Sequence, residues 1–306
     1  MSTIFDKFCE TFSLNPYEAE IFIKTAPERY KLHSISKRHG GIRYIHQPTK
    51  NLKFIQRWLV NSYFSSMPIH SCAHAYVKNR NILSNAKPHS HNKYLMKLDF
   101  SDFFTSITIR DFLIFAHDNL REFSYEEHHI LASLLFCRHK INGDFVLSIG
   151  APSSPIISNI MLYRFDQVLY DFCRTKYVYY TRYADDLSFS TNQPRILKEE
   201  VFPFVEGLCK TIPYPNYLKL NKNKVVHVSK KFNRRITGLV LSNEGNISIG
   251  RDKKRQLRAM AHQMSLNKLP PEKINKLLGY INFLKGKIDP EFAEQLIQKL
   301  NNKHNK

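Results

Sequence analysis

The clearest alternation of apolar and polar residues lies in Tyr94–Ser101. Successive side chains of a β-strand point to opposite faces of its sheet, so this pattern predicts a strand with one face in the core. The predicted core positions are Met96, Leu98 and Phe100, and the positions on the polar face are Lys97, Asp99 and Ser101. A carboxylate therefore stands on the exposed side of a half-buried strand.

A second strand pattern surrounds a pair of adjacent carboxylates. The segment Tyr177–Ser190 (YVYYTRYADDLSFS) is rich in aromatic and β-favouring residues on both sides of Asp185 and Asp186, which predicts a hairpin with both acids at its tip. Two neighbouring anions repel each other, and Mg²⁺ relieves such repulsion because it binds carboxylate oxygens together with substrate phosphates. The alternative is a simple Asp-rich turn, since Asp favours turns through local hydrogen bonds.

Helical spacing dominates other parts of the chain. Apolar residues recur at helical intervals in the first 30 residues, in Asn51–Phe64, after Ser154-Pro155 and throughout residues 250–306. Asn15 or Ser13 before Pro16, and Ser154 before Pro155, are predicted helix caps. Between the first two helical segments, Ser36–Pro48 carries Gly40-Gly41 and several basic residues, which predicts a basic hairpin.

Composition indicates a globular protein with a polyanionic partner. The chain has 306 residues, 42% of them hydrophobic, and a formal net charge of +20. A membrane surface is a competing polyanion, but no apolar run approaches the roughly 18 residues of a spanning helix. The N-terminus lacks the pattern of a signal peptide, and the five cysteines lie far apart without a CxxC motif. We therefore expect a cytoplasmic protein with reduced cysteines and no membrane partner.

The three acidic positions fit one type of chemistry. Two-metal phosphoryl transfer needs carboxylates from more than one element converging on two ions about 3.5–4 Å apart. The predicted hairpin tip supplies Asp185 and Asp186, and the polar face of the strand could supply Asp99.

The order of several motifs identifies a resemblance. MKLDFSDFF (Met96–Phe104), GAPSSPIISN (Gly150–Asn159) and YADD occur in the order and approximate spacing of the palm motifs of reverse transcriptases. The chain resembles the bacterial retron reverse transcriptases in particular, from about residue 30 to 300. Their NAxxH element is matched by Asn85, Ala86 and His89. Where they usually carry Val-Thr-Gly, this chain has Ile236, Thr237 and Gly238.

The resemblance implies an α+β, right-hand polymerase fold. Its parts would be an N-terminal helical region with fingers (1–95), a palm of antiparallel sheet plus helices (96–242) and a short helical thumb that binds RNA (243–306). A fingers insertion would interrupt the palm around 105–148.

The resemblance also implies an RNA-directed DNA polymerase with roles for individual residues. Asp99, Asp185 and Asp186 would bind two Mg²⁺ ions, or Mn²⁺, and Lys224 would protonate the leaving pyrophosphate. Phe104 would exclude a 2′-OH and so select dNTPs; an ordinary core Phe is the alternative. The dNTP would also be held by Lys37, Arg38, Arg43 and Gly150. Ile149 stands where most relatives have Gln, which removes a side-chain hydrogen bond near the incoming nucleotide.

RNA contacts are expected from charge and from the resemblance. The candidates surround Phe232 or lie on the first thumb helix: Lys230, Lys231, Arg234, Arg235, Arg251, Lys254 and Arg258. Simple solvation of these basic faces is the alternative. Double-stranded RNA is recognised mostly through its shape and backbone, whereas unpaired bases stack on aromatic side chains.

Four functions remain open at this point. A retron reverse transcriptase would copy a cognate structured noncoding RNA into branched msDNA primed from a guanosine 2′-OH, with an effector or toxin protein and host RNase H as partners and a role in anti-phage defence. A group II intron-like enzyme would need room for further domains, which the short thumb does not suggest. An RNA-dependent RNA polymerase would need room or a polar partner for the 2′-OH, and Phe104 argues against that function. An inactive RNA-binding scaffold would not need three catalytic Asp residues, and their retention argues against that function.

Overall fold

The computed structural model of the chain describes residues 2–36 and 40–301. Its centre is a four-stranded antiparallel sheet in the order β6-β7-β3-β8, here called the palm sheet. The strands are β3 (Tyr94–Asp99), β6 (Tyr179–Tyr183), β7 (Asp186–Thr191) and β8 (Val226–Ser229). The predicted strand and the predicted hairpin are therefore both confirmed, and they are direct neighbours in the sheet.

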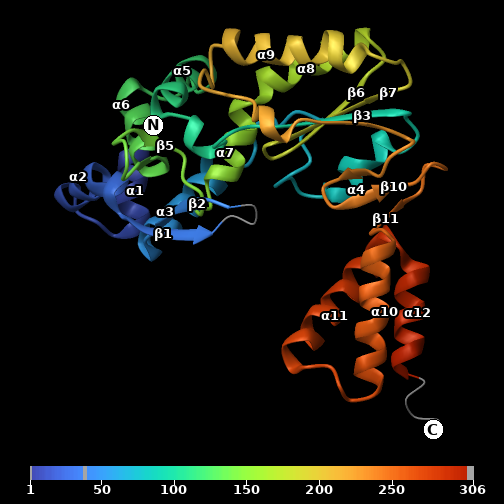
Figure 1. Cartoon of the computed structure of the whole chain (residues 1–306). Helices are drawn as coiled ribbons and strands as arrows, with labels where there is room; N and C mark the ends of the chain where they lie inside the picture. Colours follow the sequence, from blue (N-terminus) through green and yellow to red (C-terminus); the bar gives the residue numbers. More distant parts are fainter. Residues whose placement is uncertain (1, 37–39, 302–306) are drawn as a thin grey trace.

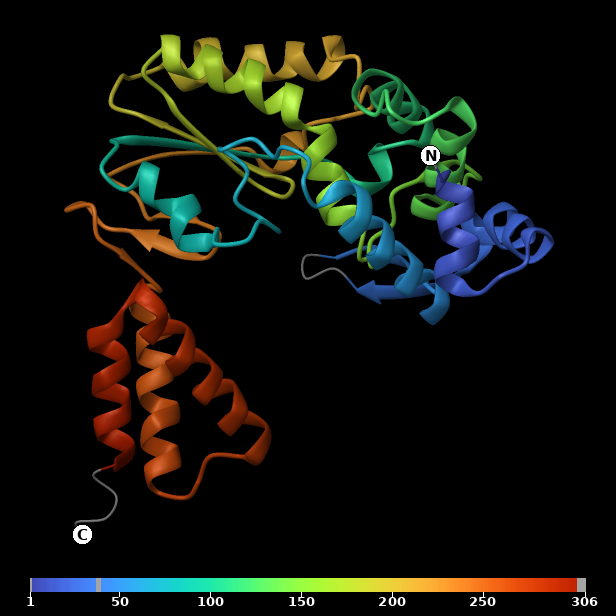
Figure 2. The same cartoon turned by 180° about the vertical axis from the view of Figure 1, so that it is seen from behind.

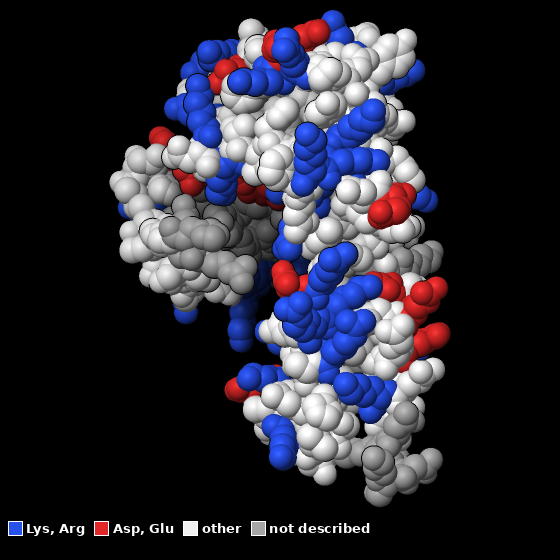
Figure 3. Space-filling view, turned by 45° about the vertical axis from the view of Figure 1, so that its right-hand side comes forward, with Lys and Arg blue, Asp and Glu red and all other residues white. Residues whose placement is uncertain are grey.

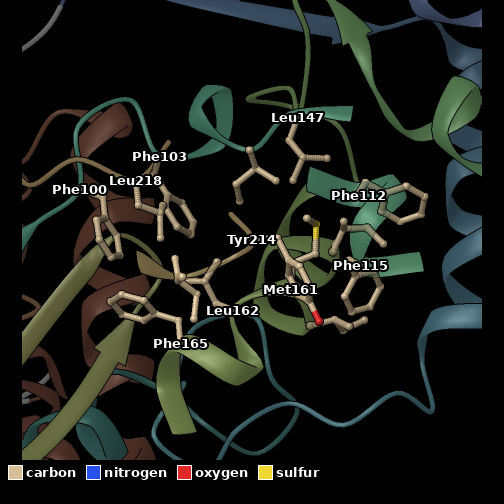
Figure 4. Packing of buried hydrophobic residues seen from close by; sticks show 14 of the residues in the cluster. Phe100, Phe103, Phe112, Phe115, Leu147, Met161, Leu162, Phe165, Tyr214 and Leu218 are labelled. Carbon is tan, nitrogen blue, oxygen red and sulfur yellow. The ribbon is translucent and has the colours of Figure 1, made fainter. Parts of the chain in front are cut away.

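Helices cover one face of the palm sheet. Helices α8 (Tyr163–Thr175) and α9 (Phe202–Thr211) run across it, and α7 (Ser154–Met161) leads into α8 (Figure 1). The core beneath β3 is aromatic: Phe100 stacks on Phe103 with ring centroids 5.7 Å apart and meets Phe165 of α8 edge-on (Figure 4). Burial of such rings is a main source of folding free energy.

Two details of the α7–α8 segment differ from expectation. Ser154 is the first helical residue rather than the cap, and Ser153, at the cap position, makes no side-chain capping bond. The predicted single helix is two helices, because Leu162 leaves helical geometry with ψ near 1°. In contrast, Asn15 caps its helix as predicted and forms a reciprocal capping box with Glu18.

The N-terminal third forms a helical body beside the palm. It contains α1 (Ile4–Phe12), α2 (Pro16–Thr25), α3 (Lys50–Leu59) and the hairpin of β1 (Tyr30–Ser36) and β2 (Ile42–Pro48). A later segment joins this body: α5 (Ile109–Asn119), α6 (Tyr125–Leu135), β4 (Cys137–Arg138) and β5 (Phe145–Val146). Helix α6 contacts α1, α2 and α3, so residues far apart in sequence share one core.

The other side of the palm sheet carries a second, smaller core. Helix α4 (Ile82–Ala86) packs near a three-stranded sheet of β9 (Arg234–Ile236), β10 (Leu239–Leu241) and β11 (Ile247–Ser248). Leu95 of β3 belongs to this cluster, together with Ala86 and Ile236. Residues on both faces of the palm sheet are thus buried, whereas the side chain of Asp99 at the end of β3 is 13% exposed.

The C-terminal helices α10 (Arg251–Ser265), α11 (Pro271–Phe283) and α12 (Pro290–Asn301) extend away from the palm as a separate bundle, here called the thumb (Figures 1 and 2). The predicted helical stripes of Leu257, Leu277 and Phe292 are buried between them. These parts are those of a right-hand polymerase fold. The exact domain boundaries at 95/96 and 242/243 stay a prediction. No helix in the described part of the chain is long and apolar enough to cross a membrane.

Candidate active site

Three carboxylates meet at one end of the palm sheet. Asp99, the last residue of β3, lies directly opposite Asp186, the first residue of β7. Asp185 occupies the turn before β7, and its carbonyl oxygen accepts a hydrogen bond of 3.1 Å from the backbone N–H of Phe100. That bond ties the hairpin turn to the end of β3. The structure therefore brings together the acids that are 86 positions apart in the sequence (185 − 99).

A lysine joins this acidic group. The Nζ of Lys224, in the short 3₁₀ turn Lys222–Lys224, lies 2.9 Å from Asp99 Oδ2. The loop before it is anchored as well, because Asn221 N–H donates to the carbonyl oxygen of Asp99 at 2.8 Å. The hydrogen bond to Asp99 and the three acidic charges raise the pKa of Lys224 above its ordinary value. Lys224 is thus held as a protonated donor beside the carboxylates.

The negative charges of the three carboxylates repel one another. Protein atoms displace water from around the carboxyl of Asp186, and together with the charges of Asp185 and Asp99 they raise its pKa to about 6. Lys97 and Lys224 counteract this shift without cancelling it. A divalent cation would relieve the repulsion, so the donor set fits a hard metal ion that prefers oxygen ligands.

The carboxylates do not by themselves form a closed metal cage. Within residues 2–36 and 40–301, no group of three or more His, Cys, Asp or Glu side chains is arranged so that it could hold a metal ion. Mg²⁺ in nucleotidyl-transfer sites is commonly bound by one or two carboxylates and completed by substrate phosphates and water. The open arrangement fits that mode, in which the substrate supplies part of the coordination.

A buried ion pair supports the carboxylate turn, and sequence analysis missed it. Arg182 and Asp166 are both fully buried, with Nη2 and Oδ2 2.6 Å apart. Arg182 also donates to Asn159 Oδ1 at 3.0 Å and to the carbonyl oxygen of Ala184 at 3.2 Å. Ala184 has a left-handed backbone (φ 56°), so its carbonyl is fixed in an unusual direction. The sequence did contain a signal for a buried charge, because Asp166 lies among the buried apolar residues of α8.

The NAxxH residues hold the other end of the same hairpin. His89 is buried; its Nδ1 lies 2.7 Å from Ser190 Oγ on β7 and its Nε2 2.8 Å from Thr181 Oγ1 on β6. Burial lowers the pKa of His89 to about 3, so the ring is neutral. The carbonyl of Asn85 accepts from the Thr181 hydroxyl, and Ala86 fills the smaller core. In this structure the motif joins β6 and β7 through the hydrogen bonds of His89, away from the carboxylates.

The Ile236-Thr237-Gly238 element is also part of the framework. Ile236 is fully buried, whereas Thr237 and Gly238 have positive φ values (45° and 86°) in the tight turn between β9 and β10. Thr237 Oγ1 donates to the carbonyl oxygen of Ile82 at 3.4 Å. This connects the small sheet to α4.

The structure describes the residues expected around a dNTP to different extents. Phe104 follows β3, is half-buried and packs against Phe103 with ring centroids 5.2 Å apart. Gly150 has a φ of 109°, and a Cβ there would come within 3.3 Å of Ile45 of β2, so the palm and the β1–β2 hairpin are in contact. Arg43 lies on β2 opposite Ile35, with its side chain outside the description. Lys37 and Arg38 lie outside the described residues.

The predicted RNA contacts need one correction. Arg234 is 1% exposed, and its guanidinium donates to the carbonyl oxygens of Ser90, Asn92 and Ser242. A side chain enclosed in this way is not available to a phosphate backbone, so its predicted role in RNA binding was wrong. Its basic neighbours Lys231 and Arg235 are exposed, as is Phe232.

The first thumb helix does carry an accessible basic face. Arg251 and Arg258 are exposed, and the guanidinium of Arg258 lies over the ring of Phe292, 4.9 Å from its centroid. Lys254 is instead half-buried and pairs with Asp289 at 2.5 Å. Lys and Arg side chains gather over the thumb helices in Figure 3.

Comparison with known proteins agrees with this arrangement. Residues 35–263 match the family described as "Reverse transcriptase (RNA-dependent DNA polymerase)". The Retron Ec83 reverse transcriptase of Escherichia coli is 37% identical over 286 residues, covering 92% of this chain and 90% of the relative. The Retron Ec73 reverse transcriptase of the same organism is 36% identical and covers 93% of each.

A solved telomerase from Candida tropicalis, in complex with a TWJ fragment of telomeric RNA, shows a TM-score of 0.48 at 14% identity. The match covers 95% of this chain but 62% of the telomerase, so this chain spans less than two thirds of that protein.

The family match and the two E. coli relatives each cover most of the chain, and both relatives are more than 30% identical to it. The chain therefore belongs to the reverse transcriptases, the RNA-directed DNA polymerases, and among them to the retron reverse transcriptases.

Proposed function

We propose that this protein copies a cognate structured noncoding RNA into DNA by two-metal nucleotidyl transfer at Asp99, Asp185 and Asp186. The observation that carries the proposal is the direct pairing of Asp99 with Asp186, with Lys224 bonded to Asp99. Carboxylates from two strands and a protonated donor are what this chemistry requires of a protein.

Each residue of this group has a distinct task. The carboxylates hold the metal ions and orient the reacting phosphate; two Mg²⁺ ions, or Mn²⁺, would activate the attacking hydroxyl and stabilise the leaving oxygens. Lys224 Nζ donates its proton to the leaving pyrophosphate. Arg182 is fully buried and keeps the turn in place through its bond to the carbonyl oxygen of Ala184, so its task is to position the turn.

Recognition of the dNTP belongs to residues of three segments of the chain. Phe104 lies beneath the sugar and excludes a 2′-OH. Gly150 shapes the floor under the new base pair, and Arg43, with Lys37 and Arg38, binds the triphosphate. An Arg side chain suits that role because it offers paired N–H donors to phosphate oxygens.

The RNA partner is held by basic residues of two segments, among which Lys231, Arg235, Arg251 and Arg258 are exposed. The first group follows β8 and includes Lys230, Lys231 and Arg235, and the second lies on α10 and includes Arg251, Lys254 and Arg258. A net charge of +20 favours association with any polyanion, and these residues would set its position.

The product proposed for this enzyme is branched msDNA that begins at a guanosine 2′-OH of the RNA. The similarity to the retron reverse transcriptases of E. coli supports this product. An effector or toxin protein would complete the system, host RNase H would remove the copied template, and the whole would act in anti-phage defence.

The test is to purify the protein from its native operon and extract the bound nucleic acid. We expect single-stranded DNA joined to RNA through a 2′-5′ bond, which an RNA debranching enzyme cleaves. Unbranched cDNA would favour a group II intron-like enzyme instead. RNA without any DNA would favour an inactive scaffold, and either result would overturn the proposal.

A further inference from the structure

The end of the β6–β7 hairpin opposite the carboxylates lies beside the C-terminal end of α8 (Figure 1). Residues of these elements line a pocket there. Its volume is about 640 Å³, within the range of roughly 300–1,000 Å³ typical of small-ligand sites. The described residues that line it include none of Asp99, Asp185, Asp186 or Lys224. The pocket is therefore separate from the catalytic carboxylates.

The lining of this pocket is aromatic and amide-rich. Tyr170, Tyr177 and Tyr179 contribute rings, and Asn192 and Gln193 contribute carboxamides. Each carboxamide has two N–H donors and a carbonyl acceptor. The intramolecular bonds of Asn192 and Gln193, to Asn92 Oδ1 and to the carbonyl of Lys176, use one donor of each, and Asn192 Oδ1 accepts from the backbone N–H of Lys93. Donors thus remain for a ligand. No Asp or Glu lies among the described residues that line the pocket.

Tyr177 is an unusual residue for its position in the backbone. Its N–H donates to the carbonyl of Arg174, and the N–H of Val178 donates to that of Cys173, which together close α8 as a Schellman motif. The residue at this position has a left-handed backbone, here with φ 54°, and glycine is the usual choice. Tyr177 is nevertheless 79% exposed, so its ring contributes little to the core. The fold does not explain an aromatic side chain there.

The pocket lining also includes a cation. Arg174 is exposed, lines the pocket, and has its guanidinium 6.0 Å from the centroid of the Tyr170 ring. A nucleotide offers a flat π-face, hydrogen-bonding edges and a phosphate. Aromatic rings, carboxamides and an arginine at one site match those three features in turn.

We infer that this pocket binds one unpaired nucleobase of the RNA partner, stacked on Tyr177 or Tyr179 and read at its edge by Asn192 and Gln193, with the flanking phosphate on Arg174. The inference rests on the proposed RNA substrate and adds a recognition site to it. Sequence-specific RNA binding mostly targets unpaired bases, and an enzyme that must choose one RNA needs such a site.

The probe is a fluorescein-labelled RNA hairpin with a single bulged nucleotide, compared in binding anisotropy with the same hairpin fully paired. All four bulge identities are measured. The wild-type protein should bind at least one bulged hairpin roughly tenfold more tightly than the paired one, as expected for one stacked base. Equal binding of all bulged and paired hairpins by the wild type would overturn the inference.

The variant Tyr177→Gly separates recognition from folding, since glycine fits the left-handed backbone better than tyrosine. It should remove the preference for the bulged hairpin, whereas Tyr177→Trp should keep it. Tyr17→Ala is the matched control, because Tyr17 is 73% exposed on α2 and lies outside the pocket. A preference that survives in both Tyr177→Gly and Tyr179→Ala would place the base elsewhere.

Two further experiments distinguish an RNA base from a free nucleotide, and the pocket inference from the proposed chemistry. Competition with AMP, CMP, GMP and UMP distinguishes an RNA base from a free nucleotide: a mononucleotide that binds more tightly than the bulged hairpin would contradict an RNA ligand. Extension of an oligo(dT) primer on poly(rA) by the wild type tests the polymerase chemistry by itself. Active enzyme without bulge preference would remove the pocket inference and leave the proposed chemistry standing.

Discussion

Asp99 at the end of β3 lies directly opposite Asp186 at the start of β7 in the antiparallel register of the palm sheet. Directly opposed residues are among the closest neighbours in a sheet, and like charges in that position are destabilising. Lys224 offsets part of this repulsion through its 2.9 Å bond to Asp99. The protein therefore accepts an electrostatic cost at this pair, as is common at functional sites.

The first prediction concerns the dependence of stability on pH. The pKa of Asp186 is raised from 3.8 to about 6, so between these pH values the folded state binds more protons than the unfolded state. The free energy of unfolding should fall as pH rises through this window and stay lower above it. Asp186→Asn should thus raise the melting temperature by roughly 2–4 °C at pH 7.5 in EDTA, a modest gain because Asp186 remains partly solvent-exposed.

At pH 4 the two proteins should melt alike, because the carboxyl of Asp186 is then protonated. Addition of Mg²⁺ at pH 7.5 should stabilise the wild type more than the variant. Melting curves that differ equally at both pH values would argue against charge repulsion as the cause.

A second prediction concerns the ion pair between Arg182 and Asp166. Asp166→Ala leaves a buried guanidinium without its partner, which should cost about 3–5 kcal/mol of unfolding free energy. The double variant Arg182→Met, Asp166→Leu removes both charges at similar volume and should be clearly less damaging. Urea denaturation followed by circular dichroism measures both. Equal losses in the single and double variants would show that packing, and not the charge, accounts for the effect.

A third prediction addresses sugar selection. If Phe104 excludes the 2′-OH, Phe104→Ala should raise the ratio of kcat/KM for rGTP over dGTP about tenfold or more, as expected when a pocket is enlarged. Phe103→Leu is the control, since Phe103 is 4% exposed and packs in the core. It should lower stability without moving that ratio. An unchanged ratio in Phe104→Ala would identify Phe104 as a structural residue.

The thumb provides a fourth prediction. Arg251→Glu with Arg258→Glu should weaken RNA binding and flatten the plot of log Kd against log salt by about one unit per lost phosphate contact. Lys254 is left intact, because its reversal would also break the pair with Asp289. Lys24→Glu on α2 changes a surface charge far from the thumb and should have little effect. A salt slope that is the same in wild type and double variant would exclude this face as the RNA contact.

Local patterns predicted the elements of this site well, because each rests on short-range rules. The alternation in Tyr94–Ser101 determined the strand and the side on which Asp99 lies, and the aromatic flanks of Asp185-Asp186 determined the hairpin. Which strands become neighbours depends on long-range packing, and there the order of the motifs and the family resemblance were needed.

The errors have the same physical origin. Arg234 was predicted to bind RNA because it stands in a basic run, yet it is buried and donates to the carbonyl oxygens of Ser90, far away in the sequence, and of Ser242. Arg182 and Asp166 were overlooked because charged residues are usually exposed, and a buried pair is recognised in the sequence only when both partners are known. The Schellman turn at Tyr177 gives no sequence signal, since glycine is absent where it is expected.

The most direct test of the central claim is incorporation of labelled dNTP on a primed RNA template in the presence and absence of Mg²⁺. The wild type should extend the primer with Mg²⁺ and stop in EDTA. Asp185→Asn with Asp186→Asn should bind the same RNA with similar affinity and yet incorporate no dNTP. Synthesis at the wild-type rate by this double variant would contradict the assignment of these carboxylates as the catalytic centre.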